Sequence, residues 1–330
     1  MSAYLVRRML GLIPVLVWIT ILSFGMIHLA PGKPTDAAMQ FNPRVSLEAR
    51  ERIAKLYGLD QPLHRQYLSW LGRIGRMDFG RSFLDDRPVL DKILERLPVT
   101  VSINLLSLGL VLLLAVPLGV FAAVRPHALF DRVTTVLVFI GYSMPAFWLA
   151  LLCMAYFGVQ LRWLPISGLH SLDYESFGLL HRGLDTAWHL VLPVLVTAFV
   201  SLAALSRYTR SSMVEVLRQD YIRTARAKGL TELRVLFHHG LRNGLLPILT
   251  ILGLSLPDLI GGSVISETIF SIPGMGRLFY DAVMARDYPV VMALVTVGAI
   301  LTMLGNFLAD AAYAVADPRI RLGQASGGVA

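Results

Sequence analysis

The sequence predicts an all-α membrane protein with six transmembrane helices, on three observations. First, 55% of its 330 residues are hydrophobic, only 16% are charged and the mean hydropathy is +0.62. An ordinary water-soluble domain is markedly more polar. Second, the apolar residues form runs of about 20 residues, the length that crosses a bilayer core roughly 30 Å thick. Third, arginines gather beside particular ends of these runs.

Six apolar runs have this length, at 9–30, 99–124, 133–158, 188–206, 241–265 and 290–315. Each run must be helical, because hydrocarbon offers no partner to free backbone N–H and C=O groups. Proline disrupts helical hydrogen bonding, so the prolines within or near the runs predict kinks. They are Pro117, Pro145, Pro193, Pro247 and Pro257.

The first run, 9–30, follows Arg7 and Arg8, as the core of a cleavable signal peptide would. It is longer than a signal core of roughly 7 to 15 residues, and no clear small-x-small cleavage site follows it. We therefore expect a retained transmembrane helix.

Positive charge predicts the orientation, because cytoplasmic loops of membrane proteins are enriched in Lys and Arg. Arginines precede the first run, flank the connection between the second and third, and follow the sixth (Arg7, Arg8, Arg125, Arg132, Arg319, Arg321). Both termini are therefore expected inside. The cytoplasmic segments are then 1–8, 207–240 and 316–330, and the external ones 31–98, 159–187 and 266–289. The segment 31–98 is also rich in Arg, but long translocated loops escape this rule.

The external segment 31–98 carries two helix patterns. Ser46 is a plausible N-cap for a helix over 47–57 that ends at Gly58. An amphipathic helix after Pro62 is predicted by apolar residues at helical spacing, namely Leu63, Tyr67, Trp70, Leu71 and Ile74. The adjacent Asp85 and Asp86 indicate a solvated turn rather than a metal site, because nothing nearby supplies further ligands.

The cytoplasmic segment 207–240 contains an amphipathic helix, expected over 212–228. One half of its helical wheel holds Met213, Val214, Leu217, Tyr221, Ile222 and Ala225, and the other half holds Glu215, Gln219, Arg223 and Arg226. Gly229 would end it, because glycine adopts a left-handed turn at little cost, and Thr231 would cap a second short helix.

Two interpretations of this amphipathic helix stand at this point. It would either lie on anionic lipid or bind a partner protein. Glu215 and Asp220 on its polar side favour a protein groove, because attraction to lipid does not require acidic residues.

The stretch Tyr221 to Leu230 closely resembles the coupling-helix motif of ABC-importer permeases, in the dipeptide and oligopeptide (peptide/nickel) branch. Further stretches look like that branch, so the resemblance covers nearly the whole chain. They are 59–62, 78–80, 141–145, 209–213, 241–247, 267–270, 273–276, 287–289 and 317–321. Across importers generally the motif opens Glu-Ala-Ala, whereas here Arg223-Thr224-Ala225 takes that place, with Gly229 in register.

The resemblance implies a type I importer permease fold, with a core domain of about 95–315, in a bacterial cytoplasmic (inner) membrane. It also implies that the short helix sits in a cleft of an ATP-binding subunit. The residues that carry this coupling role would be Glu215, Asp220, Tyr221, Arg223, Thr224, Ala225, Arg226, Ala227, Lys228 and Gly229.

The partners implied by the resemblance are a second homologous permease, two cytoplasmic ATP-binding subunits and an external substrate-binding protein. ATP and Mg would be used by the partner subunits, and this chain would bind no cofactor. The cargo would be di- or oligopeptides, with nickel chelates, glutathione or haem as alternatives.

Missing motifs exclude other functions. The sequence has no Gly-x4-Gly-Lys-Ser/Thr, so the ATPase must be another polypeptide. It has neither His-Glu-x-x-His nor Gly-x-Ser-x-Gly, which argues against an intramembrane enzyme. The net charge of +8 reflects the cytoplasmic arginines rather than nucleic-acid binding. A passive channel would not need a coupling helix.

Two places are candidates for the substrate pathway. Asp258 lies deep in the fifth run, where an acidic residue usually faces a cavity, although capping a broken helix is an equal alternative. Ser143, Met144 and Pro145 mark a kink in the third run, with packing as the alternative role.

Overall fold

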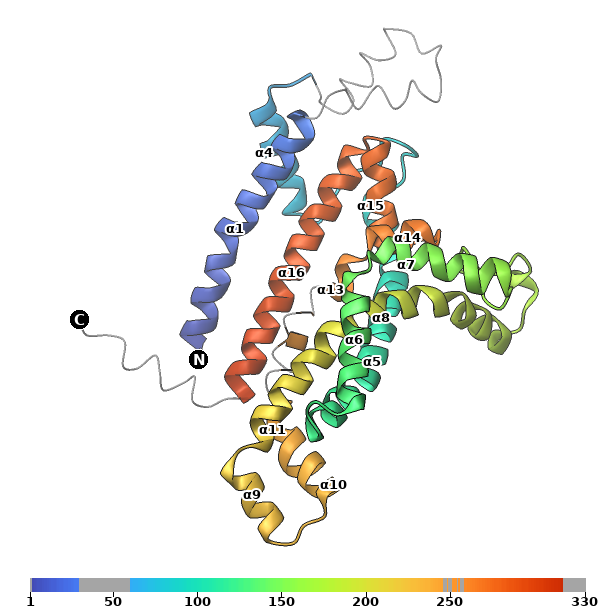
Figure 1. Ribbon diagram of the computed structural model, residues 1–330. Helices are drawn as coiled ribbons and strands as arrows, with labels where there is room; N and C mark the ends of the chain where they lie inside the picture. Colours follow the sequence, from blue (N-terminus) through green and yellow to red (C-terminus); the bar gives the residue numbers. More distant parts are fainter. Residues whose placement is uncertain are drawn as a thin grey trace.

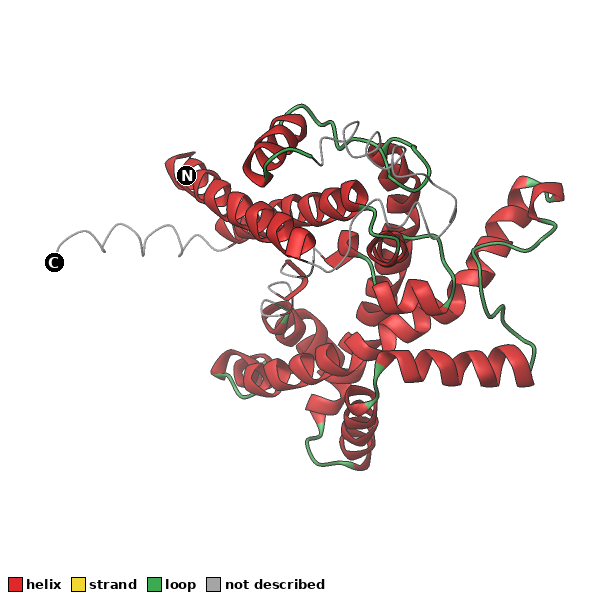
Figure 2. Ribbon diagram, turned by 90° about the horizontal axis from the view of Figure 1, so that it is seen from above, coloured by secondary structure: helices red, strands yellow, loops and turns green. Residues whose placement is uncertain are grey.

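The computed structural model describes residues 2–29, 60–245, 248, 251–253, 255 and 258–316. Within these ranges the chain forms helices and loops, with an isolated antiparallel bridge between Arg81 and Pro88 and no strand (Figure 2). The all-helical prediction is confirmed for this part of the chain. The predicted helix over 47–57 lies outside the described residues.

Four long helices dominate the fold: α1 (Ser2–Leu29), α5 (Val89–Val124), α8 (Leu179–Leu217) and α16 (Tyr288–Ala316). The last three contain stretches long and apolar enough to cross a membrane, and α1 contributes a shorter apolar stretch, Gly11–Met26. Both α5 and α8 begin well before the predicted runs at 99 and 188. Helix α5 continues through its internal prolines, as does α8.

The third predicted run does not form one straight helix. Helix α6 (Leu129–Ser143) is followed by α7 (Ala146–Cys153), which continues as the π-helix η1 (Met154–Gln160), and the two halves meet at 101°. Met144 is extended because a residue before proline is pushed out of the helical region. The kink predicted at Pro145 is confirmed, and it is a sharp break.

The described residues thus contain up to four candidate membrane spans if the bent pair counts as one. A second short apolar stretch, Leu259–Ile269, overlaps the end of the fifth predicted run, 241–265, and extends beyond it. Several residues of that run, including Pro247 and Pro257, lie outside the described residues.

Helix α5 packs along α8, and α1 lies beside α16 in the opposite direction (Figure 1). Close approach of α5 to α8 requires Gly119, because a Cβ there would stand 2.7 Å from Thr209 Cγ2. The predicted amphipathic helix is confirmed as α4 (Leu63–Ile74), which lies against α1 through a 2.9 Å hydrogen bond between Thr20 and Tyr67.

The short helices α14 (Val264–Ile269) and α15 (Met275–Met284) pack together toward one end of the molecule (Figure 1). Helix α13 (Asp258–Gly261) contacts α5, and η2 (Tyr174–Ser176) lies in the connection between η1 and α8. The opposite end carries α9 and α10 (Figure 1). The start of α1 and the end of α16 point toward that opposite end. The two ends are therefore built differently, and the amphipathic segment after α8 projects from one of them.

Candidate functional site

The chain leaves α8 at Leu217, turns through Arg218 and Gln219, and enters α9 (Asp220–Ala227). The predicted single helix over 212–228 is therefore wrong, because it is two helices. Gln219 is extended, with ψ of 149°, and acts as the N-cap of α9, while Asp220 in the first turn interacts favourably with the helix dipole. The break lets α9 leave the direction of α8 and turn back.

The apolar face of α9 packs inward, as its pattern predicts. Ile222 and Ala225 are buried against Val235, and Leu217 and Leu230 close the cluster. Val235 begins the π-helix η3 (Val235–Leu241), which follows the short α10 (Glu232–Arg234) and precedes α11 (Arg242–Gly244). The segment thus forms a helical hairpin with its own small core.

The polar face of α9 is open to solvent. Nine of the predicted coupling residues are exposed: Glu215, Asp220, Tyr221, Arg223, Thr224, Arg226, Ala227, Lys228 and Gly229. Ala225 is the exception, because it belongs to the hairpin core. Tyr221, placed on the apolar half of the wheel, is 42% exposed. The described residues leave this face free to receive a partner.

Gly229 ends the hairpin's first helix with a left-handed backbone, at φ of +75°. Its N–H donates to the carbonyl oxygen of Arg226 at 2.9 Å, which closes the last turn. A Cβ at Gly229 would meet nothing within 4 Å, so the requirement for glycine is conformational rather than steric.

Two ion pairs join residues of the hairpin. Arg226 donates to Glu232 at 2.6 Å from Nη2 and 3.2 Å from Nε. This hydrogen bond from Arg226 lowers the pKa of the Glu232 carboxyl. Arg223 lies 3.5 Å from Asp220, and both side chains are largely exposed. The predicted cap at Thr231 is present in the backbone only, with no side-chain hydrogen bond.

The hairpin is fastened to α8 by close packing. Met213 is fully buried, and its Sδ would stand 2.6 Å from a Cβ at Gly244. Ser212 Oγ donates to the carbonyl oxygen of Gly244 at 2.9 Å. These contacts fasten α11, which follows η3 in the chain, directly to α8.

An ion pair that the sequence analysis missed joins α8 to α6. Arg210 donates from Nε and Nη2 to the two carboxylate oxygens of Asp131, with 2.7 Å between Nη2 and Oδ2. The backbone N–H of His127 also donates to Oδ2, at 2.8 Å. Asp131 is buried, although the sequence analysis placed it in the connection between the second and third runs. No local sequence pattern predicted this contact.

The pathway candidates lie apart from the hairpin. Ser143, Met144 and Pro145 form the bend between α6 and α7, which lies far from the end of the molecule that carries α9 (Figure 1). Gly141 beside the bend allows close contact with Phe199 of α8, because a Cβ there would stand 2.9 Å from the ring. Asp258 begins α13, and its side chain lies outside the described residues.

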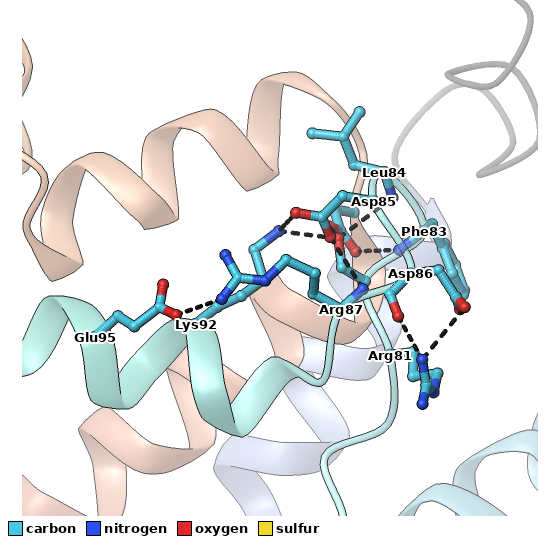
Figure 3. Close-up of polar contacts among 10 residues, drawn as sticks. Arg81, Phe83, Leu84, Asp85, Asp86, Arg87, Lys92 and Glu95 are labelled. Carbon is cyan, nitrogen blue, oxygen red and sulfur yellow. Dashed lines mark hydrogen bonds and ion pairs between the residues drawn. The ribbon is translucent and has the colours of Figure 1, made fainter.

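At the other end, charged residues tie the loop before α5 to its neighbours (Figure 3). Asp287 accepts hydrogen bonds from Ser82 Oγ and from the N–H of Phe83, the latter at 3.0 Å. Lys92 donates to Asp85 at 2.9 Å. Burial acts to raise the pKa of Asp85, but hydrogen bonds from Lys92, Ser82 and the Arg87 backbone outweigh it and leave that pKa lowered.

Two further ion pairs involve residues of this loop. Arg81 lies 3.3 Å from Asp86, and Arg87 pairs with Glu95 (Figure 3). Asp85 and Asp86, which the sequence placed in a solvated turn, thus each have a basic partner.

A buried carboxylate organises the short helices at this end. Glu267 of α14 accepts from Thr100 Oγ1 at 2.9 Å and from the N–H of Arg277 at 3.0 Å. Thr100 Oγ1 in turn accepts from the N–H of Met275 at 2.8 Å. Gly274 is required beside it, because a Cβ would stand 2.7 Å from Glu267 Oε1.

Comparison with known proteins finds two matching family models. Residues 115–322 match "Binding-protein-dependent transport system inner membrane component", and residues 1–104 match the N-terminal part of such membrane components.

Curated relatives match over almost the full chain. The oligopeptide transport system permease protein AppB of Bacillus subtilis is 47% identical over 97% of this chain and 99% of its own length. The di/tripeptide transport system permease protein DppB of Pseudomonas aeruginosa is 40% identical over 97% and 99%. The dipeptide transport system permease protein DppB of Escherichia coli is 36% identical over the same shares.

Proposed function

We propose that this chain, which belongs to the family of binding-protein-dependent transport system inner membrane components, couples peptide import to ATP hydrolysis by partner subunits. It is a permease subunit of an ATP-binding-cassette importer, and the names of its relatives support di- or oligopeptides as the cargo. The observation that carries the proposal is the hairpin after α8, whose inner face is packed and whose polar face is exposed.

The proposed topology has six spans with both termini in the cytoplasm. The arginines beside the predicted inner ends support this orientation. The common direction of the start of α1, the end of α16 and the hairpin supports it as well (Figure 1). The hairpin then lies in the cytoplasm, and the cluster around Glu267 lies outside.

In the proposed assembly, a second homologous permease completes the pathway, and two cytoplasmic ATPase subunits bind and hydrolyse ATP with Mg. An external substrate-binding protein delivers the cargo. The family name itself supports the last partner, because it describes binding-protein-dependent transport. The chain described here binds no cofactor of its own in this proposal.

The proposed coupling site is the exposed face of α9. Tyr221, Arg223 and Thr224 enter a groove of the ATPase subunit, where an aromatic ring and a guanidinium supply the contacts that typically dominate protein interfaces. Ile222 and Ala225 hold α9 against η3 and α8. A movement of the ATPase groove therefore displaces the C-terminal end of α8 together with α9.

The proposed pathway response involves the bend at Ser143, Met144 and Pro145. The ion pair between Asp131 and Arg210 supports this role, because it joins the moving end of α8 to the start of the helix that ends at the bend. Asp258 is proposed to face the pathway and attract the amino terminus of a peptide, because a carboxylate within a membrane is costly unless it faces a cavity.

A matched pair of tyrosine variants tests the coupling site. Tyr221 on α9 and Tyr280 on α15 are 42% and 41% exposed but lie at opposite ends of the molecule. We expect Tyr221→Ala to reduce severalfold the ATPase subunits that co-purify with the permease, and Tyr280→Ala to leave them unchanged. Equal co-purification of the ATPase with both variants would remove the proposed docking face.

A further inference from the structure

A cavity of about 280 Å³ lies between α5, α8 and the start of α13. Its polar lining includes Asn104 of α5, three hydroxyl residues of α8 and Ser255. On α8 these hydroxyl residues are Thr197, Ser201 and Tyr208, whose spacings of four and seven residues place them on one helix face. None of the described residues that line the cavity carries a charged side chain.

The hydroxyls of α8 have unusual surroundings for a helix that crosses a membrane. Ser and Thr in such helices ordinarily donate to a carbonyl one turn back, as Thr209 does to Leu205 at 2.8 Å. Among the described residues, the hydroxyls of Thr197, Ser201 and Tyr208 have no hydrogen-bond partner. Ser201 and Tyr208 are also exposed.

Contact of these three hydroxyls with lipid hydrocarbon would be unfavourable, because an unpaired polar group in an apolar medium costs several kcal/mol. Water or a polar ligand would satisfy these hydroxyls, whereas lipid would leave them unpaired. The described part of the lining is neutral, and its hydroxyls and amide suit neutral hydrogen-bonding groups of a ligand. The amide groups of a peptide main chain have this chemistry, and every peptide carries them whatever its side chains.

We propose that Thr197, Ser201 and Tyr208 form a hydrogen-bonding track for the main chain of the transported peptide, within the cavity between α5 and α8. The proposal rests on the proposed function and adds the surface by which the permease accepts peptides irrespective of side-chain charge. Asn104 sets the width of this track, because its Nδ2 donates to the carbonyl oxygen of Leu259 at 3.0 Å and thereby holds α13 beside α5.

Accessibility of single cysteines tests whether this face meets the aqueous pathway. Cys153 is the chain's one cysteine, so a Cys153→Ala parent offers a clean background. In the assembled importer, Ser201→Cys should react with a membrane-impermeant methanethiosulfonate, and excess tripeptide should slow that reaction. Leu195→Cys is the control, since Leu195 is an exposed apolar residue of α8 outside the cavity lining.

The control should stay unreactive, and the reagent should block uptake only in Ser201→Cys. If Ser201→Cys transports peptide but does not react, or reacts no faster than Leu195→Cys, the track is wrong. ATP-driven uptake by the parent would still stand in that case, so the outcome separates this proposal from the proposed function.

A second variant tests the chemistry without a reagent. Thr197→Val keeps the shape of the side chain and removes one neutral hydrogen bond, which corresponds to about a two- to tenfold loss of uptake rate at limiting peptide. The loss should be equal for neutral, Lys-containing and Glu-containing tripeptides. Thr134→Val is the matched control, because the Thr134 hydroxyl donates to Phe130 within its own helix. No loss, or a loss confined to peptides of one charge, would overturn the proposal.

Discussion

Arg210 of α8 and Asp131 of α6 form a two-pronged ion pair that links the helix bearing the coupling hairpin to the helix that ends at the bend. Asp131 is 4% exposed at its side chain and Arg210 is 31% exposed. Charge-assisted hydrogen bonds of this kind fix orientation as well as distance. The ion pair therefore adds a directed polar connection to the packing between α6 and α8.

Removal of the arginine should leave a buried carboxylate without its partner. We expect Arg210→Ala to destabilise the permease by about 3 kcal/mol, the low end of the range for breaking a buried pair, because Arg210 is partly exposed. Thermal unfolding in detergent measures the effect. Peptide-stimulated ATP hydrolysis should also separate from uptake.

Arg207→Ala is the control for this prediction. Arg207 is exposed one turn earlier on α8 and lies over the ring of Phe139, 5.7 Å from its centroid. Its loss should change stability by less than about 1 kcal/mol. Similar unfolding temperatures for the Arg207 and Arg210 variants would show that the ion pair adds little rigidity.

Gly229→Val should uncouple hydrolysis from transport while membrane insertion stays intact. The left-handed backbone at φ of +75° costs a non-glycine residue about 1–3 kcal/mol, and a β-branched one most of all. The end of α9 would shift to relieve it. Gly229→Asn should retain more coupling, because asparagine tolerates this conformation. The ratio of peptide taken up to ATP hydrolysed measures both variants.

The matched control is Gly183→Val in α8. A Cβ at Gly183, as at Gly229, would meet nothing within 4 Å, but the backbone of Gly183 is helical. This variant should couple normally. A normal ratio in Gly229→Val as well would mean that the left-handed turn has no part in coupling.

Gly274→Ala should disrupt the cluster around Glu267. The new methyl group would overlap the Glu267 carboxylate sterically, so α14 and α15 must separate. We expect a loss of about 1–3 kcal/mol in stability. Glu267→Gln should cost less, since the amide oxygen can still accept from Thr100. If Gly274→Ala unfolds at the wild-type temperature, the packing described here is wrong.

The ion pair between Arg226 and Glu232 predicts a narrow pH dependence. The pKa of Glu232 is lowered from its ordinary value of 4.5 by the hydrogen bond from Arg226. A lowered carboxyl pKa contributes stability above the unfolded value, and this contribution is lost as the pH falls through the folded value. Both side chains are about half exposed, so the contribution is small.

The measurement compares wild type with Glu232→Gln by thermal unfolding from pH 8 to pH 3. The difference in unfolding temperature should be constant down to about pH 5 and should vanish only below the ordinary carboxyl value of 4.5. A difference that disappears between pH 8 and pH 6 would contradict the assignment.

Several features that follow from a local rule were predicted from the sequence. Helical spacing of Ile222 and Ala225 predicted the buried face of α9, and Gly229 was found in the left-handed conformation that its position suggested. Proline chemistry predicted the kink at Pro145. Each of these depends on residues within a turn or two of one another.

Features that depend on distant residues could not be predicted. The break at Arg218 and Gln219 arises because α9 must fold back onto η3, and neither residue is a helix breaker. Asp131 and Arg210 are 79 positions apart, so nothing local pairs them. The cavity polarity likewise appears only when Asn104 and Ser201 are brought together by the packing of α5 on α8.

The central claim is that a separate ATPase drives this permease through α9. Its most direct measurement is uptake of labelled peptide by proteoliposomes that contain the complete importer and its external binding protein, with either active or hydrolysis-deficient ATPase subunits. The account predicts ATP-dependent uptake with active subunits and none with the deficient ones. Continued uptake with hydrolysis-deficient subunits would contradict it and indicate a passive channel.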